Sequence, residues 1–250
     1  MGAPVVWFPI VPLIRLTGAA AATFVLIWAV HFRGGLALIS DNKDLIFNTS
    51  RSSPSPTAVV QFESHESSRV MAVAPTMGWH RLAMLAYKTM PGTKSFKKAV
   101  HLSIQFLALC LGLIGTWAAL KFHNDKGIDN FYSLHSWLGL ACILLFSIQW
   151  GMGFATFWYP GGSRSSRAFL LPWHVFFGAY IYALAVVTAI TGLLEKATFL
   201  QASKTILRYS NEAFLINSLG ILLVLLGGLV ILALVTPGTA RSDLQRGNSE

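Results

Sequence analysis

LHSWLGLACILLFSIQWGMGFATFW, residues 134–158, contains no charged side chain and is long enough to cross a lipid bilayer as a helix. Four more long apolar segments occur in the chain, and the five together decide the fold class. We place the five spans at residues 12–31, 100–120, 134–158, 172–194 and 213–236. Such a chain is predicted to be an all-α integral membrane protein that crosses the membrane several times.

The composition agrees with a membrane protein and argues against a soluble domain. Hydrophobic residues make up 54% of the 250 residues and charged residues only 12%, about half the share found in soluble domains. The formal charge is +9, but no nucleic-acid motif accompanies it, so we expect no nucleic-acid partner. Cys110 and Cys142 form no CxxC or CxxCH motif, which leaves a disulfide framework and covalent haem attachment without support.

The loops between the spans orient the chain. Residues 88–98 carry four lysines and no acid, and residues 161–169 carry two arginines and no acid, so both loops are predicted to be cytoplasmic. Residues 31–44 and 121–130 mix both signs and are placed on the opposite side. One further crossing is therefore needed between residues 48 and 88, which predicts a bundle of six spans with both termini in the cytoplasm.

The stretch where the second span belongs is polar instead of apolar. SRSSPSPTAVVQFESHESSR, residues 50–69, is rich in serine and carries charges of both signs, and Pro75 breaks the half-apolar remnant that follows. We interpret residues 49–81 as an aberrant segment that damages the second helix of a single domain, residues 1–250. Residues 238–250 are expected to form a disordered cytoplasmic tail.

Three histidines carry the chemistry, because an ionisable side chain inside a span is costly and marks a functional site by default. His101 and His174 follow the two basic loops, so they lie at one depth near the cytoplasmic face on two helices. His135 lies near the opposite face. Imidazoles that face each other across a bundle can bind a haem iron from both sides. His135 and His174 also share the pattern H-x-x-x-G, in which the glycine leaves room for a flat macrocycle beside the helix.

Other interpretations of these histidines are weaker. Each one could be a core histidine that bonds a neighbouring backbone group, but three at matched depths argue against that. Zinc lacks a cysteine or carboxylate ligand at these depths. A hydrolase lacks an acid in the spans and a GxSxG motif, and a transporter or channel lacks broken paired spans and acidic pathway residues.

Six motifs resemble the plant members of the cytochrome b561 family. They are HFRGGLAL (31–38), DNKDLIFN (41–48), AMLAYK (83–88), YSLHSWLGL (132–140), FWYPGGSR (157–164) and LPWHVFFG (171–178). The resemblance implies a six-helix bundle with two b-type haems in the core of helices 2–5. It also implies an ascorbate-dependent transmembrane oxidoreductase: cytoplasmic ascorbate gives one electron, and monodehydroascorbate or a ferric chelate takes it on the other side.

The resemblance assigns the three histidines by position. His101 and His174 resemble the ligands of the cytoplasmic haem, and His135 resembles one ligand of the other haem. The family's fourth ligand is a histidine that follows FN, but Ser50 occupies its place here. His65 is a less favoured replacement ligand, because it would need a helix through Pro75 with charged side chains in lipid. We therefore expect one secure haem site and a doubtful second one.

The resemblance also points to two substrate sites. Lys94, Lys98 and Arg167 resemble the ascorbate site, and plain positive-inside loop charge explains them equally well. His123 and Phe122 resemble the electron-acceptor site, and the alternative for His123 is a solvated loop residue. The resemblance further implies a homodimer in the vacuolar or another endomembrane.

A second reading of the chain follows from the break after residue 48. The chain could be an inactive or single-haem membrane isoform without transmembrane electron transfer. Our hypothesis for the polar stretch is retained or misread noncoding sequence. Sequencing transcripts across codons 45–90 tests it, and a uniform population that encodes this stretch in a two-haem protein would refute it.

Overall fold

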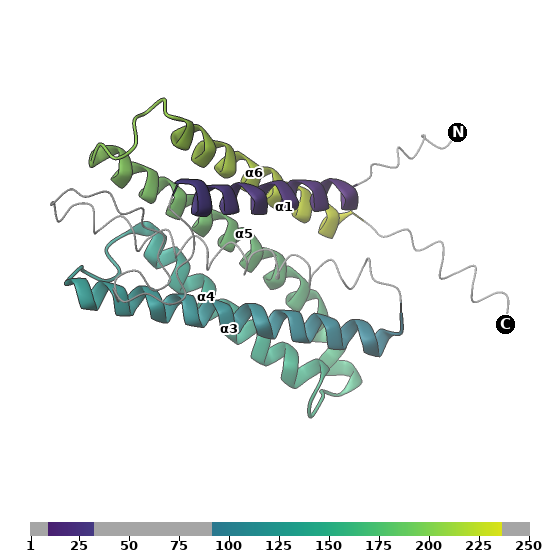
Figure 1. The fold of residues 1–250 in the computed structure, drawn as a ribbon. Coiled ribbons are helices and arrows are strands. Elements are labelled where there is room, and N and C mark those ends of the chain that lie inside the picture. The colour runs from purple at the N-terminus through teal and green to yellow at the C-terminus, as the bar shows by residue number, and fades with distance from the viewer. Residues whose placement is uncertain (1–9, 33–91, 237–250) are drawn as a thin grey trace, which may run out of the picture.

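The computed structural model describes residues 10–32 and 92–236, and within these ranges the chain is all helical (Figure 1). The elements are α1 (Ile10–Ile27) with the π-helical turn η1 (Trp28–Phe32), α3 (Lys94–Lys126), α4 (Leu134–Phe157), α5 (Arg164–Ala202) and α6 (Asn211–Val235). Five helices in these ranges are long and apolar enough to cross a membrane, which confirms the predicted class. The second span, the segment 49–81 with Ser50 and His65, and the tail 238–250 lie outside the described residues.

Two helices are longer than the apolar segments that predicted them. We expected a loop over residues 121–130, but α3 continues to Lys126 and ends at Gly127, whose φ of 65° suits glycine. α3 and α5 also begin inside the predicted basic loops, capped by the hydroxyls of Thr93 and Ser163. Hydropathy marks where lipid ends, whereas a capped polar helix extends into water. The 33 residues of α3 rise about 50 Å, well beyond a hydrocarbon core of about 30 Å.

The helices pack in sequence around a central α5. α5 lies between α4 and α6, with α1 against α6 and α3 against α4 (Figure 1). One large core cluster joins α1, α5 and α6 around Trp28, Leu200 and Leu219. A smaller cluster joins α3, α4 and α5; its buried members are Ala108, Leu109, Phe146 and Ile181.

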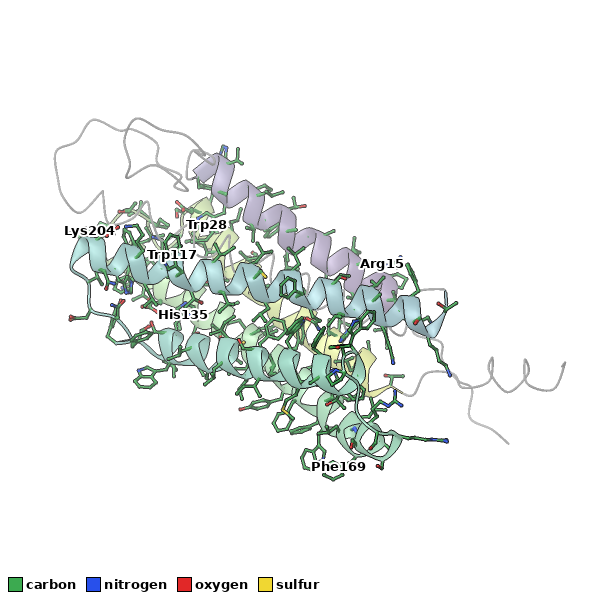
Figure 2. All side chains as sticks on the ribbon, turned by 90° about the horizontal axis from the view of Figure 1, so that it is seen from below. Arg15, Trp28, Trp117, His135, Phe169 and Lys204 are labelled. Carbon is green, nitrogen blue, oxygen red and sulfur yellow. The ribbon has the colours of Figure 1, made fainter. Side chains whose placement is uncertain are left out.

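The two ends of the bundle are named by residues that Figure 2 labels. Arg15 and Phe169 lie toward one end, called the near end, and Trp28, His135 and Lys204 lie toward the other, the far end. α5 starts at the near end and α4 starts at the far end, so the two helices are antiparallel.

The α4–α5 seam repeats every seven residues. From α4, His135 Nδ1, Cys142 Sγ and Gln149 Nε2 each donate to a backbone carbonyl of α5. The acceptors are Thr188 O at 2.9 Å, Ile181 O at 3.8 Å and His174 O at 2.6 Å. A seven-residue step returns to nearly the same face of a helix, so the three bonds lie along one line. They join α4 and α5 in a single register.

Candidate functional site

The structure brings His101 of α3 and His174 of α5 together at the near end. Their ring centroids are 6.3 Å apart and the ring planes meet at 70°. A metal–imidazole bond is about 2.0–2.1 Å, and adding half a ring at each side gives about 6 Å between the centres of two rings on one ion. The observed separation therefore suits two imidazoles that would hold one metal ion between them.

His174 has close neighbours on α4. A Cβ added at Gly153 would lie 2.9 Å from His174 Cε1, so glycine at this position leaves the space that the ring uses. The Phe157 ring lies 5.4 Å from the His174 ring. The ring of His174 is thus held between α4 and the α3 histidine.

His135 lies at the far end and is held in one tautomer. A carbonyl oxygen can only accept, so the 2.9 Å contact with Thr188 O requires a proton on His135 Nδ1. Nε2 then keeps its lone pair, which is the arrangement of a metal-ligating histidine whose other ring nitrogen is hydrogen-bonded. The ring also rests against Gly192, where an added Cβ would lie 2.8 Å from His135 Cε1.

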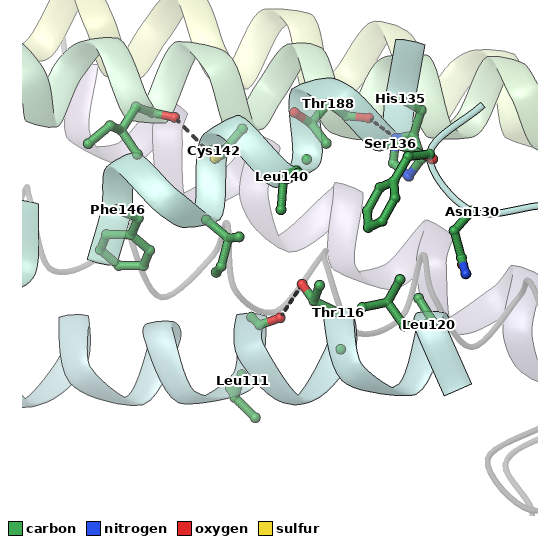
Figure 3. A pocket seen from close by; sticks show the side chains of 18 of the residues that line it. Leu111, Thr116, Leu120, Asn130, His135, Ser136, Leu140, Cys142, Phe146 and Thr188 are labelled. Carbon is green, nitrogen blue, oxygen red and sulfur yellow. Dashed lines mark hydrogen bonds between the residues drawn. The ribbon is translucent and has the colours of Figure 1, made fainter. Parts of the chain in front are cut away.

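A cavity of about 200 Å³ opens beside His135 between α3 and the α4/α5 pair (Figure 3). His135 and Asn130 lie at one end of it and Phe146 at the other. The lining is mainly apolar, with Gly112 and Gly115 on the α3 side. An apolar engineered cavity of about 150 Å³ holds a benzene ring. This space is therefore large enough to admit part of a flat apolar ligand.

His123 lies in α3 and lines the same cavity. The alternative that it is a solvated loop residue is wrong, because it is 8% exposed and its Nδ1 lies 3.0 Å from Asn130 Oδ1. Asn130 in turn donates to Asn124 Oδ1 at 2.8 Å. The sequence suggested a loop because the apolar run stops at residue 120, although the helix does not. Phe122 is half-buried beside His123, with 6.2 Å between the ring centroids.

The predicted basic residues gather at the starts of α3 and α5. Lys98 is half-buried, and its ammonium makes a long hydrogen bond of 3.5 Å to Phe157 O at the end of α4. Phe157 contacts His174, so Lys98 lies close to the near pair. Lys94 and Arg167 are exposed in the first turns of their helices. Helix N-termini already carry partial positive charge, so the cations there add to a field that favours an anion.

Known proteins are similar to this chain over most of its length. Residues 70–200 match the family described as Eukaryotic cytochrome b561. Transmembrane ascorbate ferrireductase 2 of Arabidopsis thaliana is 56% identical over 237 residues, 95% of each chain. Probable ascorbate-specific transmembrane electron transporter 1 of Oryza sativa subsp. japonica is 42% identical over 241 residues, 95% of this chain and 94% of the other. The chain belongs to the eukaryotic cytochrome b561 family.

A more distant relative extends the comparison beyond plants. The lysosomal membrane ascorbate-dependent ferrireductase of Mus musculus is 34% identical over 231 residues, 90% of this chain and 87% of the relative. Together with the apolar helices, the family makes this cytochrome b561 an integral membrane protein, and membership implies b-type haem. The family match begins at residue 70, directly after the polar stretch of residues 50–69.

Among the described residues of this cytochrome b561, the near end supplies two imidazoles that could hold such a group and the far end supplies one. At the near end, the fit rests on the spacing of the His101 and His174 rings. At the far end, it rests on the tautomer of His135 and the cavity beside it.

The sequence analysis did not identify four residues that contact the histidines. Thr188 and Gln149 act through hydrogen bonds that involve backbone carbonyls, which no side-chain pattern announces. Gly153 and Gly192 did leave a signal: each follows a histidine of its own helix by 18 residues. Residues 135–153 and 174–192 of the cytochrome thus share the longer pattern H-x3-G-x13-G. In an antiparallel pair, this pattern sets each histidine opposite the second glycine of the other helix.

Proposed function

We propose that this cytochrome b561 is an ascorbate-dependent transmembrane oxidoreductase. It would take electrons from ascorbate on the cytoplasmic side and deliver them to monodehydroascorbate or a ferric chelate on the other. The single observation that carries the proposal is the 6.3 Å separation of the His101 and His174 rings. The names of the Arabidopsis and rice relatives, an ascorbate ferrireductase and a probable ascorbate-specific electron transporter, support the same class.

The histidines are proposed to hold the cofactor. His101 and His174 would hold one b-type haem between them, and His135 would supply a ligand for a second one at the cavity. Bound haem supplies one-electron redox chemistry, and the protein sets its potential through ligands and surroundings. The bond to the Thr188 carbonyl keeps His135 in the tautomer whose Nε2 carries a lone pair and no proton.

The near end is proposed to bind ascorbate. Ascorbate is a small monoanion, and an ammonium group in a partly desolvated place gives it a charge-assisted hydrogen bond. Lys98 is half-buried beside Phe157 and is the leading candidate for that contact. Lys94 and Arg167 are exposed, so salt screens them and we assign them mainly to attraction of the anion. The basic loops on this side orient it toward the cytoplasm.

The far end is proposed to receive the acceptor. His123 and Asn130 form a hydrogen-bonded pair that lines the cavity. Phe122 lies against His123. Nearby, Tyr132 donates to Glu195 Oε1 at 3.2 Å. These polar groups would orient an acceptor next to His135 without closing the site to water.

The middle of the bundle keeps the two ends apart. His135 lies opposite Gly192 and His174 opposite Gly153, and the 18 residues of α4 between these levels rise about 27 Å. The buried cluster around Phe146 and Ile181 lies between them. Its apolar side chains would place a nonpolar region between the two sites, as vectorial electron transfer across a membrane needs. An endomembrane location is supported by the name of the lysosomal relative, and we propose a homodimer there.

The test uses the purified full chain in proteoliposomes loaded with ascorbate. We expect a reduced b-type absorbance band and reduction of an external ferric chelate. Replacing His101 and His174 together by alanine should remove the part of the band that comes from the near-end haem and should stop reduction of the external chelate. The matched control is His31→Ala, because His31 lies in η1, which packs against α1 and α6. Full ascorbate reduction in the double histidine variant would overturn the proposed site.

A further inference from the structure

The α4–α5 pair seats each of its histidines on a glycine of the opposite helix. His174 of α5 rests on Gly153 of α4, and His135 of α4 rests on Gly192 of α5. The two contacts are equivalent, because both glycines lie 18 residues after the histidine of their own helix. We propose that Gly153 and Gly192 are positioning residues that set the orientation of the two imidazoles. This inference rests on the proposed function.

The contacts at the two glycines are tighter than side-chain packing allows. A Cβ at Gly153 would lie 2.9 Å from His174 Cε1 and 3.4 Å from its Nδ1. At Gly192 it would lie 2.8 Å from His135 Cε1, 3.0 Å from Nδ1 and 3.3 Å from Nε2. Carbon atoms in contact prefer about 3.5–4.0 Å. One methyl group at either position therefore displaces the ring or the helix.

Neither ring can move without changing one of its observed contacts. A shift of the His135 ring stretches its 2.9 Å bond to Thr188 O. The His174 ring has Phe157 at 5.4 Å and His101 at 6.3 Å, so a shift changes at least one of these separations. Because the seam bonds fix the register of α4 and α5, moving the helix is the more costly response.

Other glycines of the same helices show that the tight contact is specific. An added Cβ would meet Thr188 Cγ2 at 3.5 Å from Gly139 and Gln149 Nε2 at 3.7 Å from Gly178, both ordinary contacts. At Gly151, two residues from Gly153, an added Cβ would have no atom of the described residues within 4 Å. The same is true of Gly228 on α6. Gly139 and Gly178, the H-x-x-x-G glycines, thus have ordinary neighbours. The tight contact with a histidine ring is made by the second glycine of each pattern, Gly153 or Gly192, which we call the seat.

The experiment compares alanine at the two seats with alanine at open positions. Gly153→Ala and Gly192→Ala are paired with Gly151→Ala and Gly228→Ala, which carry the same change in helix propensity. The full-length protein is purified with its haem. The readouts are the electron paramagnetic resonance spectrum of the oxidised protein and the midpoint potential of each haem.

We expect each seat variant to change one site and leave the other. Gly153→Ala should alter the signal that His174→Ala removes, and Gly192→Ala the signal that His135→Ala removes. A displaced imidazole binds ferric iron less well, so the potential should rise. The expected size is a tenfold change in the reduction equilibrium or more, which is 59 mV for one electron. Gly151→Ala and Gly228→Ala should match the unaltered chain.

Two results separate failure of this inference from failure of the proposed function. If His174→Ala removes a haem while Gly153→Ala gives the spectrum and potential of Gly151→Ala, the seat proposal is wrong and the ligand stands. If His174→Ala removes no haem, the proposed function itself fails. Should Gly153→Ala not fold, Gly192→Ala carries the same test at His135, with the Thr188-bonded ring as the reporter.

Discussion

Gln149 is the seam residue whose contribution to stability follows most directly from the structure. Its Nε2 donates to the backbone carbonyl of His174 at 2.6 Å, across the α4–α5 interface. Replacing Gln149 by methionine keeps an unbranched side chain of similar length and removes the donor. We expect a less stable α4–α5 pair and a small disturbance of His174, whose own carbonyl is the acceptor.

The expected magnitude follows from the type of bond. Hydrogen bonds between membrane helices are worth about 0.6 kcal/mol on average and about 1.7 at most. The 2.6 Å separation is slightly shorter than the usual range for an N–H···O bond, and we expect a value between these two, about 1 kcal/mol. For a chain of this size, that corresponds to a fall in the melting temperature of about 2–4 °C. The His174 carbonyl keeps its own helical bond, so no orphaned acceptor adds to the cost.

The assay is thermal unfolding of the purified haem protein in detergent, followed by helical circular dichroism. Ser147→Ala is the matched control, because Ser147 is on the same helix and its hydroxyl bonds only its own helix, at Ile143 O. The reasoning is refuted if Gln149→Met melts at the same temperature as Ser147→Ala. A Gln149→Met chain that is more stable than the unaltered one would contradict it more strongly.

Three further predictions concern the two ends and the core. Lys98→Met should raise the KM for ascorbate about tenfold, because it removes a charge-assisted contact of about 1.5 kcal/mol. Lys121, which pairs with Asp125 at 2.8 Å at the far end, is the control, and Lys121→Met should leave the KM unchanged. Steady-state reduction kinetics measure both variants. His123→Leu removes the bond to Asn130 and should slow reduction of an external ferric chelate about tenfold without slowing haem reduction by ascorbate, and equal slowing of both steps would count against an acceptor-side role. Trp28→Phe removes a 2.7 Å bond to Glu212 and should lower the melting temperature by roughly 4–8 °C, whereas Trp117→Phe at a side chain that is 64% exposed should not; a similar loss in both variants would assign the effect to ring size.

The spans could be read from the sequence because burial in lipid acts on every residue of a segment. Loop charge predicted His101 and His174 at one end of the bundle and His135 at the other, and the structure places them so. Helix ends were harder. α3 continues past its apolar run to Lys126, so His123 was assigned to a loop although it is a buried helical residue.

The contacts around the histidines could not be predicted from the sequence. Thr188 contributes a carbonyl oxygen, which every residue has, so its identity says nothing about its role. Gly153 and Gly192 required the register of an antiparallel pair, and only a repeated spacing of 18 residues pointed to them. The cavity beside His135 depends on how three helices meet, and no single segment encodes that.

The central claim is that His101 and His174 together hold a haem, separately from His135. The most direct measurement is the amount of haem per polypeptide in the purified chain, in the His101→Ala/His174→Ala variant and in His135→Ala. We predict that the double variant loses one haem per chain and that His135→Ala keeps the haem held by the near pair. Equal haem content in the double variant and the unaltered chain would contradict the account.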